Sequence, residues 1–348
     1  MRITRPLIFA VSVLLLLLLF VLPFTLPSGA VTDEAHRRYI DAGEEDFIVW
    51  DEEEEDPYGK VESKPFRLLA SAGLSDVVFS DDVIPLPVDN SPGRMPIGEN
   101  YTEDGYSDDT IAVEMERLRM FDSDVFVAHV KIATPSQLRT AYAGNKMNST
   151  RTNHTSRLSI NFNGIVAVNG DYYPETKAGY IVRQGEVYRE KTSKNMDLLL
   201  VDENGDFHIL LRGHENQAAG VRGFLEQHQI VNGFFFGPAL VMDGEVQPIP
   251  KDYQFAPNQP NPRAAIGQTG PLSYILIAVN GRTESSRGVT AAELAEIMGE
   301  LGSLQAYNLD GGNSATLAFH GQVYNAKPQA ERSVTDIIYF ATATQQGK

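Results

Sequence analysis

Short apolar runs separated by turn-forming residues fill most of the chain from residue 105 onward, and this pattern predicts strands. The runs 110–118 and 125–132 flank a turn at 121–124 and predict a β-hairpin. Two further hairpins are predicted across Gln184-Gly185 and Asn204-Gly205, because glycine after a polar residue favours tight turns. This part of the chain is therefore predicted to be a succession of antiparallel hairpins.

Three segments are predicted to be helical. The first begins at Thr134, which is followed by proline at the first helical position and glutamine at the third, and extends to about residue 143. The second covers 156–163. The third begins at Thr290, where Glu293 completes a capping box, and ends at Gly302 after one apolar stripe.

Many strands and about three helices in this order predict an α+β fold, with one large, mostly antiparallel twisted sheet and a few packed helices. We assign this fold to a single domain over residues 105–345. A chain of 348 residues with 42% hydrophobic residues is long enough to bury a sizeable core.

The N-terminus carries an apolar run at 7–24, preceded by Arg2 and Arg5. A helix of that length rises about 27 Å, close to the thickness of a bilayer core. Small residues at Ser28-Gly29-Ala30 offer a cleavage site, so residues 1–30 are predicted to be either a signal peptide or a transmembrane anchor. The flanking charges predict a single-pass membrane protein with its C-terminal domain outside the cell, or a secreted protein if cleavage follows Ala30.

Residues 31–104 are predicted to form an acidic, Pro- and Gly-containing extended spacer. The net charge of the chain is −17, and much of it lies in this spacer. Such a charge argues against nucleic acid as a partner. The chain has no cysteine, which excludes disulfides, thiolate nucleophiles and cysteine zinc sites.

The first candidate for chemistry lies near the C-terminal end. An apolar run at 304–309 predicts a buried strand that ends at Asp310 and is followed by Gly311 and Gly312, which free the backbone to turn sharply. Such a turn can hold an anion against main-chain N–H groups, with side-chain contacts from Asn308, Asp310 and Ser314. A tight Asp-Gly turn between strands is the alternative.

A second strand end repeats this pattern. The apolar run 165–168 is followed by Asn169, Gly170 and Asp171 and then by two tyrosines. Each motif alone is compatible with a simple turn. Two strand ends that carry asparagine and aspartate in one chain indicate a shared site.

Two other segments carry candidate binding residues. Arg263 begins a predicted strand, where its guanidinium suits bidentate contact with phosphate or carboxylate, although a surface salt bridge is the alternative. Three consecutive phenylalanines at 234–236 are expected in the core, but at a pocket rim one of them, Phe235, would instead lie against a sugar face.

The sequence predicts no histidine metal cluster. Its seven histidines are scattered, and no two of them are three or four positions apart. The segment 202–206 resembles the opening of a calcium loop but lacks the later glutamate, so a hairpin turn is predicted there.

Taken in order, these motifs resemble those of the phosphodiester glycosidase family. The resemblance rests on Asn169-Gly170-Asp171-Tyr172-Tyr173, on Arg263 with the four residues after it, on the helix capped by Thr290, and on Asn308-Leu309-Asp310-Gly311-Gly312. It covers roughly residues 105–342 and extends to Arg332 and to the stretch from Phe235 to Pro238. Asn313 departs from the pattern, because many relatives have a small residue there.

The resemblance implies an exported or membrane-anchored hydrolase that removes a sugar from a sugar-1-phosphodiester in a glycan or cell-envelope polymer, with a link to exopolysaccharides. Asp171 and Asp310 would then be the catalytic carboxylates. The implied substrate-binding residues are Asn169, Gly170, Arg263, Asn308, Gly311, Gly312, Ser314, Arg332 and Phe235.

Three alternatives remain open at this stage, one of which is a structural extracellular domain with no pocket that joins the two motifs. Asp171, Asp310 and asparagine oxygens are also suited to hold Ca²⁺, which would then bind the phosphate. The chain is also compatible with a non-hydrolytic extracellular protein of the same fold that binds carbohydrate or assembles exopolysaccharide.

Overall fold

The computed structural model describes residues 86–144, 146–147, 151–325, 327 and 330–344, together with positions 74, 77 and 79. The apolar run at 7–24 and the acidic residues 33–56 lie outside the described residues. In the described part of the chain, no helix is both long and apolar enough to cross a membrane.

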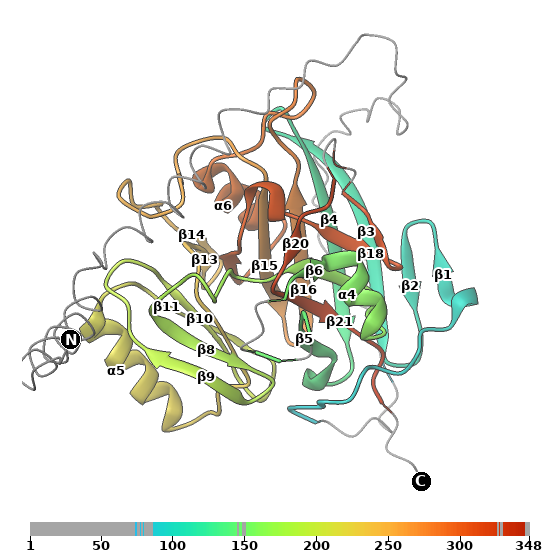
Figure 1. Ribbon diagram of the computed structural model, residues 1–348, viewed down its shortest axis with the longest axis horizontal. Helices are drawn as coiled ribbons and strands as arrows, with labels where there is room; N and C mark the ends of the chain where they lie inside the picture. Colours follow the sequence, from blue (N-terminus) through green and yellow to red (C-terminus); the bar gives the residue numbers. More distant parts are fainter. Residues whose placement is uncertain are drawn as a thin grey trace, which may run out of the picture. The chain divides into compact units, whose positions relative to one another are not determined.

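The largest sheet has nine strands within the described residues, in the order β1-β2-β3-β4-β16-β15-β17-β13-β14, and all neighbours pair antiparallel (Figure 1). This agrees with the predicted large antiparallel sheet. Its strands are β1 (Tyr101–Thr102), β2 (Gly105–Ser107), β3 (Ile111–Met120), β4 (Ser123–Ile132), β13 (Ala239–Met242), β14 (Glu245–Val246), β15 (Arg263–Gly270), β16 (Ser273–Val279) and β17 (Gln305–Asn308).

Two sheets of five described strands and one strand pair complete the β structure. The first has the order β11-β10-β12-β8-β9, with β8 (Gly179–Arg183), β9 (Glu186–Lys191), β10 (Leu198–Val201), β11 (Phe207–Leu210) and β12 (Asn232–Phe234). The second has the order β19-β18-β7-β21-β5, with β5 (Leu138–Tyr142), β7 (Val166–Asn169), β18 (Leu317–Phe319), β19 (Gln322–Val323) and β21 (Asp336–Phe340). The pair is β6 (Asn153–His154) with β20 (Ser333–Val334).

Strand β16 shows how the large sheet divides the core. Tyr274, Leu276 and Ala278 face the side where the two smaller sheets pack, whereas Ile275, Ile277 and Val279 face the side of helix α6. Alternate residues of a strand point to opposite faces, so a strand that is apolar throughout is buried on both sides. The large sheet is therefore the central layer of the domain.

Helix α6 (Ala291–Glu300) covers one face of the large sheet and packs on β13, β14 and β17 (Figure 1). Its predicted cap is confirmed: Thr290 Oγ1 accepts from the Glu293 N–H, and the Glu293 carboxylate accepts from the Thr290 N–H. Gly302 follows with φ of 80°, as a left-handed helix end requires. This helix fixes the position of β17, which leads to Asp310.

The predicted hairpins are also confirmed. Strands β3 and β4 pair from Ile111 with Ile132 to Met120 with Ser123. Phe121 and Asp122 form the turn between them, both with positive φ, which matches a two-residue hairpin turn. The hairpins β8–β9 and β10–β11 form across the predicted glycine turns.

The predicted helix over 134–143 is wrong beyond its first turn. Gln137 and Thr134 make the expected capping box, but it supports only the 3₁₀ turn η3 (Pro135–Gln137). The residues after it form β5, which pairs along its whole length with β21. Pairing with a strand some 200 positions away in sequence outweighed the local helix signal.

Two other helices are present in the described residues. Helix α4 (Thr155–Asn161) overlaps the predicted segment 156–163, and it packs on β7, β18 and β21. Helix α5 (His214–Leu225) contacts β11 and was not predicted. Its buried positions include the polar Gln217, so its apolar stripe is weak in the sequence.

Residues 86–104, which the sequence assigned to the spacer, pack on the domain. The Leu86 N–H donates to Thr134 Oγ1 at 2.8 Å, and Asp89 pairs with the buried Arg139 at 2.8 Å. Arg94 forms an isolated bridge with Thr342.

Candidate active site

The loop after β17 is held close to the start of β15. The Leu309 N–H donates to the Ala264 carbonyl at 2.9 Å, and the Gly312 N–H donates to the Pro262 carbonyl at 2.8 Å. A Cβ on Gly311 would lie 2.8 Å from the Pro262 oxygen, and Gly312 has φ of 58°. The two glycines are therefore needed for a close main-chain approach and for a left-handed turn.

This loop also meets the loop after β7. The side-chain amide of Asn169 donates to the main-chain carbonyls of Asp310, at 2.8 Å, and of Gly170, at 3.1 Å. Its Oδ1 accepts from the Thr316 N–H at 3.1 Å. Asn169 therefore joins the two predicted motifs, and its hydrogen-bonding groups are used within the protein.

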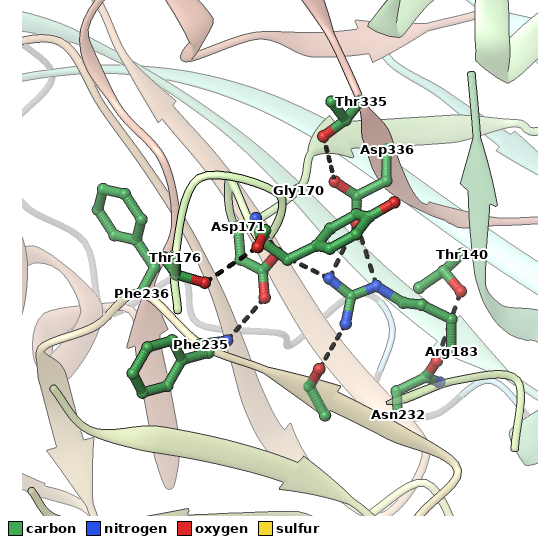
Figure 2. Close-up of polar contacts among 12 residues, drawn as sticks. Thr140, Gly170, Asp171, Thr176, Arg183, Asn232, Phe235, Phe236, Thr335 and Asp336 are labelled. Carbon is green, nitrogen blue, oxygen red and sulfur yellow. Dashed lines mark hydrogen bonds and ion pairs between the residues drawn. The ribbon is translucent and has the colours of Figure 1, made fainter. Parts of the chain in front are cut away.

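Asp171, two residues after Asn169, lies in a buried ion cluster (Figure 2). Arg183 Nη2 lies 2.7 Å from Asp171 Oδ1 and 2.9 Å from Asp336 Oδ2, and all three side chains are almost fully buried. Asp171 also accepts main-chain N–H groups from Tyr173, at 3.2 Å, and Phe235, at 2.6 Å. Both oxygens of Asp171 are thus occupied.

The cluster places two carboxylates against one guanidinium. Burial lowers the pKa of Arg183, but the charges of Asp171 and Asp336 outweigh burial and raise that pKa. Burial raises the pKa of Asp336 to about 6, although Arg183 opposes the shift. Gly170 packs directly on this cluster, since a Cβ there would lie 2.3 Å from Asp336 Oδ1.

Asp310 is the carboxyl group best suited to proton transfer. It is only 5% exposed, and its buried Oδ1 has no hydrogen-bond partner among the described residues. Burial raises the pKa of Asp310 to about 6; Ser314, Arg332 and the Gly311 N–H favour the ionised form, whereas the charge of Asp171 disfavours it. A carboxyl group with this pKa exchanges protons readily near neutral pH.

Asn308 supplies a second buried oxygen on the same strand end. Its amide nitrogen donates to the Gly237 carbonyl at 2.7 Å, while its Oδ1 has no hydrogen-bond partner within the described part of the chain. Asn308 and Asp310 are two positions apart. Each has one buried oxygen without a hydrogen-bond partner among the described residues, and such atoms call for an explanation.

Two cations lie close enough to influence Asp310. Arg332 is exposed, and Lys327 Nζ donates to the Asn313 carbonyl at 3.1 Å and to Thr316 Oγ1 at 2.5 Å. Burial lowers the pKa of Lys327 to about 8, and Arg332 lowers it too, while Glu331 and Asp310 raise it. Arg332 was predicted from the sequence, but Lys327 was not.

Two further residues lie near Asp310 or near the turn at Gly311-Gly312: Tyr172 and Arg282. Tyr172 is partly buried and has φ of 61°, which is unusual for a bulky side chain and is typical of functional sites. The charges of Asp310 and Arg332 both act on its hydroxyl. Arg282 Nη1 donates to Asn313 Oδ1 at 3.2 Å and lies near Gly312.

Three predicted binding residues have internal partners in the structure. Arg263 donates to the carbonyls of Val289, Ala256 and Gln259, at 2.8–3.1 Å, and so anchors the 256–259 loop. The Gly312 N–H is used by Pro262. The Phe235 ring is 1% exposed in the core beside Gly179, so Phe235 contributes its N–H to Asp171 rather than a ring face at a rim.

The sequence did not predict Arg183 and Asp336 of the ion cluster, nor the positively charged residues Lys327 and Arg282. Arg183 ends an otherwise apolar strand and Asp336 begins another, and a charge at such a position is the only signal for either. No local pattern marks Lys327 or Arg282, and Tyr172 was visible only as a member of the motif that begins at Asn169. Their role depends on which loops meet.

Metal ligands among the described residues do not gather at Asp310. Both oxygens of Asp171 are occupied, so the calcium alternative would draw on the unpartnered oxygens of Asp310 and Asn308. Folding brings His208 and His228 together beside Asp202, a convergence that the spacing of the histidines along the chain does not signal.

A family model and solved structures are similar to this chain. The family model for phosphodiester glycosidases matches residues 162–341, which is 180 of the 348 residues. This segment includes Asn169, Asp171, Arg263, Asp310 and Arg332.

One curated relative is the SPbeta prophage-derived uncharacterized protein YomE of Bacillus subtilis (strain 168). It is 33% identical over 108 residues, which are 31% of this chain and only 17% of that protein.

Two solved structures are similar at 17% sequence identity. The catalytic domain of zebrafish N-acetylglucosamine-1-phosphodiester alpha-N-acetylglucosaminidase, auto-inhibited by its pro-peptide, matches with a TM-score of 0.52 over 76% of this chain and 99% of that chain. A hypothetical protein from Synechocystis matches with a TM-score of 0.45 over 66% of this chain and 62% of that chain. From the family match over more than half of its length, the chain belongs to the phosphodiester glycosidase family.

Proposed function

We propose that the chain is a hydrolase that removes a sugar from a sugar-1-phosphodiester of a glycan or cell-envelope polymer. The observation that carries the proposal is Asp310, a buried carboxyl with a raised pKa and one unpartnered oxygen in the described structure, influenced by the charges of Arg332 and Lys327. The zebrafish structure, an enzyme named for a sugar-1-phosphodiester, supports the substrate class.

The leaving group determines what such a site must supply. A phosphate monoester loses its second proton near pH 6, so it departs as a stable anion without first accepting a proton. Breaking the bond between the sugar carbon and the phosphate oxygen therefore needs no general acid. It needs positive charge beside the departing phosphate and a base that takes a proton from water.

The proposed roles follow from these needs. Asp310, ionised above its pKa of about 6, accepts the proton of the attacking water. Arg332 and Lys327 stabilise the phosphate, and Arg282 extends the positive charge along the glycine turn. Asn308 Oδ1 and the Ser314 hydroxyl orient sugar hydroxyls.

Asp171 has a positioning role in this proposal. Both of its oxygens accept hydrogen bonds, so it has little capacity to act as nucleophile or base. It holds the Phe235 main chain, and its charge adds to burial, the main cause, in raising the pKa of Asp310. Direct acid–base chemistry by Asp171, which the sequence favoured, is therefore replaced here by an electrostatic role.

The test is incubation of the full-length chain with a panel of sugar-1-phosphodiesters in ¹⁸O-labelled water. Label in the released sugar and not in the phosphate is the expected result, and Asp310→Asn should lower kcat by about 100-fold or more. Asp252→Asn, which changes an exposed carboxyl, is the matched control. Binding of the substrates without turnover by the wild type would instead support a non-hydrolytic carbohydrate-binding or exopolysaccharide-assembly protein.

A chelator tests the calcium alternative in the same assay. The proposed roles use side chains alone, so turnover should survive removal of Ca²⁺. Loss of turnover in chelator, with recovery on Ca²⁺ and not on Zn²⁺, would place a calcium ion at the site.

We also propose that the run at 7–24 exports the domain or anchors it in the cell membrane, with the catalytic part outside the cell. Its length, its freedom from charge and the arginines before it support this location. Fractionation of cells that express the full-length chain, followed by protease treatment of intact cells, tests it. Retention of a protected chain in the cytoplasm would contradict it.

A further inference from the structure

We propose that Asp202, His208 and His228 form a site for a divalent transition-metal ion, with Zn²⁺ as the expected occupant. These residues come from the β10–β11 turn, from β11 and from the segment after α5. Their ligand atoms all lie within 4.8 Å of one another. Two imidazoles and one carboxylate are ligands that suit Zn²⁺ and related metals.

The two distances from Asp202 fit tetrahedral coordination. Asp202 Oδ2 lies 3.1 Å from His208 Nε2 and 3.2 Å from His228 Nδ1. Bonds of about 2.0–2.1 Å to Zn²⁺ at tetrahedral angles would place neighbouring ligand atoms about 3.3 Å apart. The two distances from Asp202 are therefore close to ligand spacing, and the two imidazole nitrogens lie within 4.8 Å of each other.

Hydrogen bonding within the cluster leaves one imidazole unexplained. His208 Nε2 is within hydrogen-bond distance of Asp202 Oδ2. His228 Nδ1 is buried and close to the same oxygen, yet it has no hydrogen bond to any described residue. Two nitrogens that converge near one carboxylate oxygen without both bonding to it are better matched to a shared ion than to a salt bridge.

The surrounding residues hold the ligands in place. Asp202 Oδ1 accepts the main-chain N–H groups of Asn204, at 2.8 Å, and Asp206, at 2.9 Å, which leaves Oδ2 directed at the histidines. The Phe224 ring packs against both imidazoles, with centroids 5.0 and 5.4 Å away. Such outer contacts orient metal ligands in proteins.

Glu203 is the candidate for a fourth ligand. Its Oε2 accepts from the Gln229 N–H at 2.8 Å, and its Oε1 lies 3.5 Å from His228 Nδ1. Both histidine side chains are partly exposed, so an ion can reach the cluster from solvent.

The proposed metal site lies at the opposite end of strand β12 from the candidate active site. Val201, just before Asp202, pairs with Asn232 at the start of β12. The Phe235 N–H, which binds Asp171, follows the end of the same strand. A metal at Asp202 would therefore join the end of α5 to the β10–β11 turn and stabilise the sheet from the far end of its strands.

The test is equilibrium dialysis of the full-length chain with Zn²⁺ against a competing chelator, together with the visible absorption spectrum of the Co²⁺ form. One ion per chain is expected, with a tetrahedral Co²⁺ spectrum and a higher Tm in Zn²⁺. His208→Gln and His228→Gln should each weaken binding on the order of 100-fold and abolish the rise in Tm. His214→Gln, which changes an exposed histidine at the start of α5, is the matched control.

Comparison of the variants with the wild type separates this site from other places on the chain where Zn²⁺ can bind. The acidic run at 51–56 attracts cations but is unchanged in every variant. Circular dichroism without metal shows whether the variants fold; Asp202→Asn, which keeps an oxygen for the turn, replaces any variant that does not. Binding by the wild type that equals that of the His208→Gln/His228→Gln double variant, or tighter binding of Ca²⁺ than of Zn²⁺, would overturn the proposal.

Discussion

The side-chain amide of Asn169 donates to the main-chain carbonyl of Asp310 at 2.8 Å, across 141 positions of sequence. This bond joins the loop after β7 to the loop after β17, and the Asp310 N–H approaches the Gly170 carbonyl in return. The position of the Asp310 carboxyl therefore depends on a residue that has no need to contact substrate.

Replacing Asn169 with aspartate should misplace Asp310. The variant loses two donated hydrogen bonds and turns carboxylate oxygens towards the carbonyls of Gly170 and Asp310. We expect a loss of about 3 kcal/mol in the free energy of unfolding and a large fall in kcat. Urea denaturation and the phosphodiester assay measure the two effects. Asn258→Asp, at an exposed position, should change neither, and wild-type stability of the Asn169 variant would contradict this role.

Adding one carbon at Gly170 should disturb the ion cluster. A Cβ there would lie 2.3–2.6 Å from the three carboxyl atoms of Asp336, which Arg183 holds in place. Gly170→Ala should therefore lose about 1–3 kcal/mol of stability and reduce activity. Gly223→Ala is the control, because that exposed position in α5 has open space and should gain up to about 1 kcal/mol. Equal effects of the two changes on Tm would show that the close packing at Gly170 is unimportant.

Removing Arg183 should be costly in a pH-dependent way. Arg183→Met leaves Asp171 and Asp336 buried without their counter-charge, which should cost about 3–5 kcal/mol near pH 7.5. The loss should be smaller at pH 5, because the pKa of Asp336 is already about 6 and protonation removes its charge. Chemical denaturation at both pH values measures this difference, with the exposed Arg222→Met as control. A loss that is the same at both pH values would argue against unpaired carboxylates as its cause.

Asp310 should lower the stability of the protein at neutral pH. Its pKa rises on folding from 3.8 to about 6, so the native state binds the proton more tightly than the unfolded state does. The free energy of unfolding should therefore fall as pH increases from about 4 to about 6, by up to about 3 kcal/mol from this group. Asp310→Asn should be more stable than the wild type at pH 7.5 and similar to it at pH 4. A variant that is less stable at pH 7.5 would contradict the raised pKa.

The rate of hydrolysis should depend on pH through two groups. Activity should increase as Asp310 ionises, with a pKa of about 6, and decrease as Lys327 loses its proton, with a pKa of about 8. Lys327→Arg keeps a positive charge to much higher pH and should remove the decrease on the alkaline side. The pH profile of kcat/KM tests both limbs. An alkaline limb that persists in Lys327→Arg would assign it to another group.

Local patterns in the sequence determined many of the elements. The hairpins β3–β4, β8–β9 and β10–β11 and the cap of α6 depend on residues that are neighbours in the chain, and the structure has each of them as predicted. The two strand ends that carry Asn169 and Asp310 were also visible, because apolar runs followed by glycine leave a local signal.

The tertiary structure alone decided which groups meet. The residues after Thr134 form β5 because β21 lies beside them, and Arg183 contacts its two aspartates, 12 and 153 positions away in sequence, only in the folded structure. His208 and His228 came together because α5 returns the chain to the β10–β11 turn. Side-chain spacing along the chain encodes a helix or a turn, but charge pairing and burial depend on distances that exist only once the sheets have formed.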